Sequence, residues 1–152
     1  MPHFLINKNE IKSSFIELNT PDIIAHIVSA RRIKTGESIK FIDEEYNVYN
    51  CSVISADKKL LKAEILSQKK SNRILKYNLS LVQSILMSDA QNLLIANATQ
   101  TGVKKIYPVI SDNVSTKVDN KKIDKWQKIV YENFKQCERA DMAIVQPIRQ
   151  LK

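Results

Sequence analysis

Residues 79–111 read LSLVQSILMSDAQNLLIANATQTGVKKIYPVIS and predict a strand, a helix and a second strand in succession. The first apolar run is hydrophobic on both faces toward its end, which is typical of a strand covered on both sides. Ser88 followed three residues later by Gln91 is a capping-box signature for the start of the helix, and Gly102 ends it. Pro108 has no amide hydrogen, so it must lie at a strand end or where no ladder hydrogen bond is donated.

The chain after this stretch continues the same alternation. A helix is predicted from near Asp119 to about Ala140, because its apolar residues recur with the helical period. Residues 142–151 then form a strand and its exit, confined by Pro147. Strand, helix, strand, helix and strand in this order make the first half of an α/β domain with a parallel sheet.

The sequence before residue 69 has a different period. A helix is predicted from Thr20 through about Arg32, with a hydroxyl cap, a proline at its first position and an acid in its first turn. The segments that follow alternate apolar and polar residues between short turns, which indicates a small antiparallel barrel. We therefore predict a mixed fold in three parts, which are a barrel over residues 1–68, a junction over 69–76 and a partial α/β domain over 77–152.

The composition favours a cytoplasmic protein with an anionic partner. The 152 residues carry 24 Lys and Arg against 16 Asp and Glu, a net charge of +8. Such an excess favours a polyanion, because neutralised phosphates release counterions, although it also serves simply to keep a protein in solution. Two glycines are too few for a glycine-rich phosphate loop. The N-terminus does not read as a signal peptide, and we expect no membrane partner.

Metal and nucleophile chemistry are not predicted. Cys51 and Cys137 lie far apart, and the two histidines, His3 and His26, do not cluster with them. A zinc site needs four converging ligands, so no metal is expected. No Ser/His/Asp or Cys/His constellation stands out, and the catalytic base stays unknown.

Two basic clusters are the candidate contacts for a polyanion. The first, the helix-end cluster, comprises Arg31, Arg32 and Lys34. Its guanidinium groups could bind phosphates, or its cations could merely offset the dipole of an ordinary helix C-terminus. The second, the junction cluster, comprises Lys69, Lys70 and Arg73. It reads either as an RNA-facing segment or as a solvated linker.

Four segments, in order along the chain, resemble the RsmE family of uridine-N3 methyltransferases of small-subunit (16S) ribosomal RNA, within the SPOUT superfamily. They are HIVSARRIKTGESIKFID (26–43), LSLVQSIL (79–86), ANATQTGVKKIYPVIS (96–111) and KWQKIVYENFKQCERA (125–140). This resemblance implies a PUA-like RNA-binding barrel followed by a trefoil-knotted α/β methyltransferase domain. It also implies S-adenosylmethionine (SAM) as cofactor, a role in ribosome biogenesis, a homodimer, and a catalytic cleft that Gln136 and Arg139 face.

The sequence also departs from the family pattern. The family's lysine, glutamate and leucine of K-A-T-E-L-G stand here as Asn97, Gln100 and Thr101. The family's glycine-rich loop and closing segment, which thread the knot, wrap SAM and build most of the dimer interface, have no counterpart in the 152 residues. We therefore expect this chain alone not to bind SAM and its knot to be incomplete. An RNA-binding remnant, or a decayed or split gene product without catalysis, is the alternative to an active methyltransferase.

Overall fold

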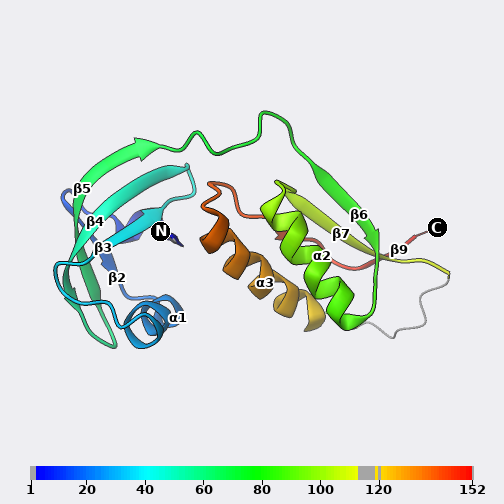
Figure 1. Ribbon diagram of the computed structural model, residues 1–152, viewed down its shortest axis with the longest axis horizontal. Coiled ribbons are helices and arrows are strands. Elements are labelled where there is room, and N and C mark those ends of the chain that lie inside the picture. The colour runs from blue at the N-terminus through cyan, green and yellow to red at the C-terminus, as the bar shows by residue number, and fades with distance from the viewer. Residues whose placement is uncertain (1–2, 113–118, 120, 152) are drawn as a thin grey trace. The chain divides into compact units, whose positions relative to one another are not determined.

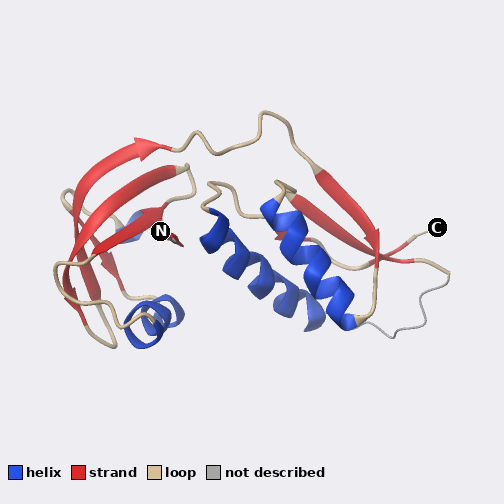
Figure 2. Ribbon diagram, viewed as in Figure 1, coloured by secondary structure: helices blue, strands red, loops and turns tan. Residues whose placement is uncertain are grey.

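The computed structural model describes residues 3–112, 119 and 121–151, and the chain divides into two compact units, Met1–Asn72 and Arg73–Lys152. The first unit is built mainly from strands, and the second combines strands with the two longest helices (Figures 1 and 2). Each unit has its own hydrophobic core.

The first unit is a curled five-stranded sheet. Its elements are β1 (His3–Leu5), η1 (Lys8–Glu10), β2 (Phe15–Leu18), α1 (Pro21–Ile24), η2 (Ala25–Ala30), β3 (Ser38–Ile42), β4 (Asn47–Ala56) and β5 (Leu61–Lys70). The strand order is β1-β3-β4-β5-β2, and every pairing is antiparallel except that of β1 with β3. Register shifts between β4 and β5 allow the long strands to bend, so that the sheet curls around its core (Figure 2).

The core of this unit follows the alternation seen in the sequence. Tyr49, Cys51 and Val53 of β4 are buried on the inner face, while their neighbours along the strand are more exposed. Ile24 and Ile27 of the helical segment close one side of this core. The predicted mixed fold with a curled N-terminal sheet is therefore confirmed.

The predicted first helix is wrong in two respects. It is not one regular helix, because α1 passes into the wider π-helical turn η2, in which the Arg31 N–H donates to the carbonyl of His26 at 3.1 Å. Thr20 does not cap it through its hydroxyl, which instead donates to Glu10 at 2.9 Å. Glu10 is buried and needs that donor, so a contact between distant residues replaces the local cap.

The second unit is a small parallel sheet with two helices. Its elements are β6 (Ser80–Ser84), α2 (Ser88–Gln100), β7 (Lys105–Ile110), α3 (Lys121–Cys137), β8 (Ile144–Val145) and β9 (Arg149–Gln150). β7 pairs with β6 on one side and with β8 and then β9 on the other. Figure 1 shows α2 and α3 side by side, and their apolar faces pack with the sheet into one core.

Among the described residues, only one face of β6 is covered, which corrects the expectation of a strand buried on both sides. Leu81 packs into the core, whereas its neighbour Val82 is 60% exposed. The expected capping box is also wrong, because Met87 is the N-cap and the Gln91 side chain accepts from the Leu86 N–H at 2.9 Å. α2 therefore begins at Ser88, the residue that the predicted capping box placed before the helix.

Pro108 lies inside the central strand, opposite the break between β8 and β9. Ile106 and Ile110 on either side of it accept hydrogen bonds from Gln146 and Leu151 across that edge. The nitrogen of Pro108 faces the same edge, since alternate residues of a strand direct their backbone groups to the same side. This confirms that the proline lies where no ladder hydrogen bond is donated.

Candidate functional site

Arg31 of the helix-end cluster is held by an aromatic contact. Its guanidinium carbon lies 5.8 Å from the centroid of the Phe4 ring, and Phe4 meets His26 edge-on, also with centroids 5.8 Å apart. Phe4 is buried in the core of the barrel, while Arg31 is exposed. A cation over a fixed ring is restrained yet keeps its polar edge available to a ligand.

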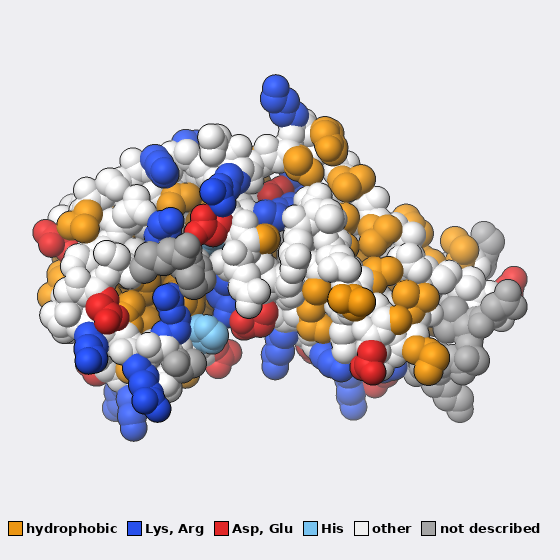
Figure 3. All heavy atoms as spheres, viewed as in Figure 1, with side chains coloured by type: hydrophobic (Ala, Val, Ile, Leu, Met, Phe, Trp, Pro, Cys, Tyr) orange, Lys and Arg blue, Asp and Glu red, His pale blue; other side chains and the backbone are white. Residues whose placement is uncertain are grey.

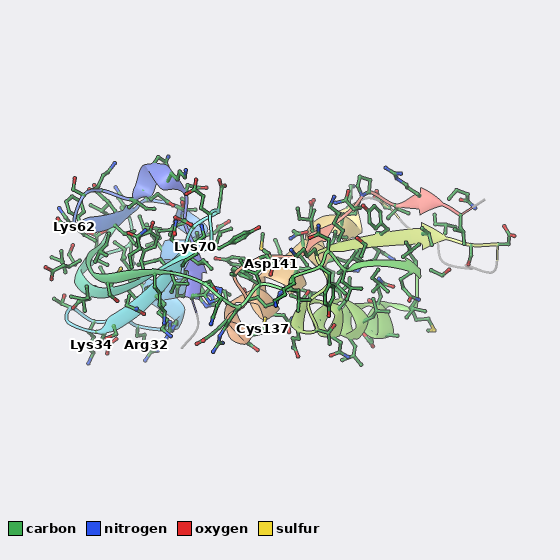
Figure 4. All side chains as sticks on the ribbon, turned by 90° about the horizontal axis from the view of Figure 1, so that it is seen from above. Arg32, Lys34, Lys62, Lys70, Cys137 and Asp141 are labelled. Atoms are coloured by element: carbon green, nitrogen blue, oxygen red, sulfur yellow. The ribbon has the colours of Figure 1, made fainter. Side chains whose placement is uncertain are left out.

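Arg32 and Lys34 follow in an exposed turn. Arg32 has φ 52°, the left-handed conformation that a glycine usually adopts after a helix. The next residue, Ile33, donates its N–H to Ile27 at 3.4 Å and closes the turn. The Lys34 N–H donates to the Glu37 carboxylate at 3.0 Å. Figure 4 shows Arg32 and Lys34 near each other, with Lys70 apart from them.

Strand register separates the two basic clusters within the first unit. Lys69 and Lys70 pair with the start of β4, at Val48 and Asn47, whereas the turn after Lys34 pairs with Val53. Val48 and Val53 are roughly 17 Å apart along the strand at about 3.4 Å per residue. The barrel therefore presents two separate basic positions.

A buried carboxylate holds the turn beside Lys70. Asp43 accepts hydrogen bonds from the Glu45 N–H, the Asn47 N–H and amide, and the Tyr49 hydroxyl, all at 2.8–2.9 Å. Burial raises the pKa of Asp43, but these hydrogen bonds outweigh it and hold the pKa below its ordinary value. Burial, with the contact to Asp43, raises the pKa of Tyr49 to about 12. Asn47, the partner of Lys70 in the sheet, is fixed in this way.

Arg73, the last residue of the junction cluster, belongs to the second unit. Its guanidinium lies 3.0 Å from the Glu138 carboxylate. The Arg73 side chain is largely exposed and that of Glu138 only partly, and ion pairs near the surface typically stabilise a protein by about 1 kcal/mol or less. Gln136 is also exposed and lies on the last turn of α3.

Arg139 is buried and ties the end of α2 to the start of β7. Its guanidinium donates to the carbonyls of Thr99, Gly102 and Val103 at 2.6–3.3 Å and to Asp141 at 2.9 Å. The structure thus shows a fold-stabilising role for this residue, and its place at a catalytic cleft stays a prediction. Sequence reasoning did not identify these contacts, because the three carbonyls lie 36 to 40 residues away along the chain and no local pattern marks them.

The second unit also has an apolar groove along α2. Leu93 and Leu94 line it with Leu81 and Val103, and its volume is about 490 Å³. Figure 3 shows hydrophobic side chains gathered over this unit. Met87 and Leu93 are among its exposed large hydrophobic residues.

The carboxyl ends of β6 and β7 are where an open α/β sheet places a ligand. The hydroxyls of Ser84 and Ser111 meet there at 3.1 Å. Both glycines of the chain lie elsewhere, Gly36 in the barrel and Gly102 after α2. The described residues at this edge therefore offer hydroxyls but no glycine-built cradle, and by themselves they do not fit a nucleoside cofactor such as SAM.

Comparison with known proteins defines the class. Residues 18–66 match the model of the RNA methyltransferase PUA domain, and residues 73–152 match that of the RNA methyltransferase domain. The chain thus belongs to the RNA methyltransferase family, and the predicted PUA-like character of the barrel is confirmed.

Among the relatives, the chain is similar to ribosomal RNA small subunit methyltransferase E of Aquifex aeolicus, with 31% identity over 123 residues that cover 78% of this chain and 53% of the relative. The resemblance found in the sequence is thereby confirmed. The enzyme of the same name from Neisseria gonorrhoeae, solved with S-adenosyl methionine, has 27% identity and a TM-score of 0.84 over 99% of this chain and 62% of that one.

A Legionella pneumophila methyltransferase, solved with its bound cofactor SAM, has 22% identity and a TM-score of 0.80, which shows a shared fold. It is matched over 97% of this chain and 62% of its own. The chain therefore spans about half the length of the curated relative and less than two thirds of these solved structures. Among the described residues, no helix is long and apolar enough to cross a membrane.

Proposed function

We propose that this protein takes part in SAM-dependent methylation of N3 of a uridine in small-subunit ribosomal RNA, in the cytoplasm. The observation that carries the proposal is the order of two matches in one chain, an RNA methyltransferase PUA domain followed by an RNA methyltransferase domain. The name of the Aquifex relative supports the small ribosomal subunit as the source of the substrate.

The barrel docks the RNA through its two basic positions. Arg31, restrained over Phe4, and the exposed Arg32 and Lys34 offer guanidinium and ammonium donors at one position. Lys69 and Lys70 offer the other, roughly 17 Å away along β4 at about 3.4 Å per residue. Such a span suits phosphates that are several nucleotides apart or on opposite sides of a groove, so the barrel reads backbone geometry more than sequence.

The second unit belongs to the methyl-transfer half of the protein. Arg139 fixes the α2–β7 connection from inside, and Gln136 is exposed beside it. When bound, SAM supplies the methyl group. The expectation that this chain alone does not bind SAM stays a prediction, and calorimetric titration of SAM into the folded chain tests it. A dimer is proposed for the complete family architecture.

Deletion of the gene is the direct test of the proposal, because it does not depend on which residues bind the cofactor. We expect 3-methyluridine to disappear from small-subunit ribosomal RNA when nucleosides are quantified by mass spectrometry. Unchanged 3-methyluridine would overturn the proposed activity and leave RNA binding without catalysis.

A matched pair of variants then tests the docking surface. The triple variant Arg31→Ala, Arg32→Ala, Lys34→Ala should lose affinity for small-subunit RNA and show a weaker salt dependence. The control variant removes three exposed lysines elsewhere on the barrel, Lys12, Lys58 and Lys59. Equal losses in both variants would show that the helix-end cluster contributes only general charge.

A further inference from the structure

A small polar pocket lies at the starts of β6 and β7. Its lining residues are Asn78, Ser80, Lys104, Lys105 and Tyr107. None of them belongs to either basic cluster. The pocket volume is about 220 Å³. A water molecule occupies about 30 Å³ of liquid, and pockets for drug-sized ligands begin near about 300 Å³. The pocket therefore suits one small polar group rather than a nucleoside.

The chemical groups of the residues that line the pocket favour an anionic ligand. The described residues that line it carry two ammonium groups, two hydroxyls and one amide and include no carboxylate, although the Lys104 ammonium also lies 3.4 Å from Asp141 behind the pocket. Ammonium groups only donate hydrogen bonds, while the hydroxyls and the amide can donate as well. A ligand that satisfies such a set has several acceptor oxygens and negative charge, which describes a phosphate group.

The register of the sheet explains why these side chains converge. Ser80 of β6 is the direct partner of Lys105 in β7. Tyr107 lies two residues further along β7 and so projects from the same face as Lys105. Ile106, between them, points into the core instead. Ser80, Lys105 and Tyr107 therefore lie on the face of the sheet opposite the helices, while Lys104, just before β7, lines the pocket from the start of the strand.

Lys104 is positioned by the buried network behind it. Its ammonium lies 3.4 Å from one carboxylate oxygen of Asp141, and Arg139 donates to the other oxygen. One carboxylate is shared between two cations, so the network keeps a net positive charge at the pocket. A lysine that is already ordered loses less conformational entropy when an anion binds.

We propose that this pocket binds a phosphate group of the RNA backbone, an inference that rests on the proposed function. Open α/β sheets place small ligands at the carboxyl ends of their strands, and this pocket lies at the opposite end, where β6 and β7 begin. The pocket is therefore separate from the edge of the sheet at which Ser84 and Ser111 meet.

Salt-dependent binding of a small-subunit ribosomal RNA fragment to the chain tests the inference. The variants are Lys105→Ala, Tyr107→Phe and, as a control with the same charge change, Lys125→Ala on the exposed side of α3. Thermal unfolding confirms that each variant folds. We expect Lys105→Ala to lower the magnitude of the slope of log K against log salt by about 0.7, the value for one contact to single-stranded nucleic acid. Tyr107→Phe should weaken binding without changing the slope, and Lys125→Ala should change neither.

A titration with inorganic phosphate, followed by amide NMR shifts at Ser80, Lys105 and Tyr107, distinguishes the source of the phosphate. Shifts with phosphate together with the altered RNA slope support the inference. Shifts with phosphate but an unchanged slope overturn it in favour of a free phosphate compound. Identical slopes for Lys105→Ala and Lys125→Ala, without phosphate shifts, overturn it entirely while RNA docking by the barrel stands. Failure of the unmodified chain to bind the RNA would instead contradict the proposed function.

Discussion

Substitution of Arg32 by glycine should stabilise the barrel and weaken RNA binding at the same time. Arg32 has φ 52°, where a residue with a Cβ atom is strained by about 1–2 kcal/mol. Glycine removes that strain but increases the entropy of the unfolded chain, which costs about 0.5–1 kcal/mol. The difference leaves a gain of about 0.5–1 kcal/mol. For a unit of this size we expect Tm to rise by roughly 2–8 °C.

Arg32→Ala is the matched control, because it removes the same charge and keeps the strain. Both variants should lower the salt slope of RNA binding by about 0.7, the loss of one phosphate contact. Only Arg32→Gly should raise Tm in thermal unfolding followed by circular dichroism. If Arg32→Gly melts at or below the temperature of Arg32→Ala, the strain argument is refuted. If RNA binding is unchanged in both, Arg32 does not contact RNA.

Three further outcomes are expected. The pKa of Asp43 is lowered in the folded state, so its contribution to stability is complete above about pH 4–5 and is lost as the pH falls through the folded-state pKa. Asp43→Asn should flatten this acid dependence in urea unfolding at a series of pH values, and an unchanged pH profile would contradict it. Arg139→Ala should destabilise the second unit by about 3–5 kcal/mol, because it leaves Asp141 buried without its main partner. Urea unfolding measures this loss, and one below about 1 kcal/mol would show that Arg139 is dispensable. The exposed apolar edge at Val82 should make the chain self-associate, and Val82→Lys should reduce the mass seen by light scattering. A monomeric unmodified chain would contradict that expectation.

The regular spacing of apolar residues was enough to predict those helices and strands that bury one face in a core. Trp126, Val130 and Phe134 recur with the helical period, and α3 occupies Lys121–Cys137 within the predicted range. Tyr49, Cys51 and Val53 likewise identified the inner face of β4. The buried positions of such an element can be recognised in the sequence because they face the core whatever small changes the backbone makes.

Details that depend on distant residues were not predictable. The hydroxyl of Thr20 donates to Glu10 rather than to its own helix, and the extra width of η2 leaves no trace in composition. The sequence identified the basic residues of the candidate site. It did not give the distance between the two basic clusters, which depends on the register of β4. The carbonyls of Thr99, Gly102 and Val103 that Arg139 reaches could be recognised only once α2 and β7 were in place. The assignment of these residues to RNA contact stays a prediction.

Pro108 has a consequence for how the second unit opens. Because it carries no amide, hydrogen exchange along β7 should report two short protected stretches, Lys105–Tyr107 and Val109–Ile110, rather than one. On one side β8 pairs with the first stretch and β9 with the second, whereas β6 pairs with β7 across both stretches on the other side. Because β6 joins them, the two stretches should lose protection together even though the proline divides them.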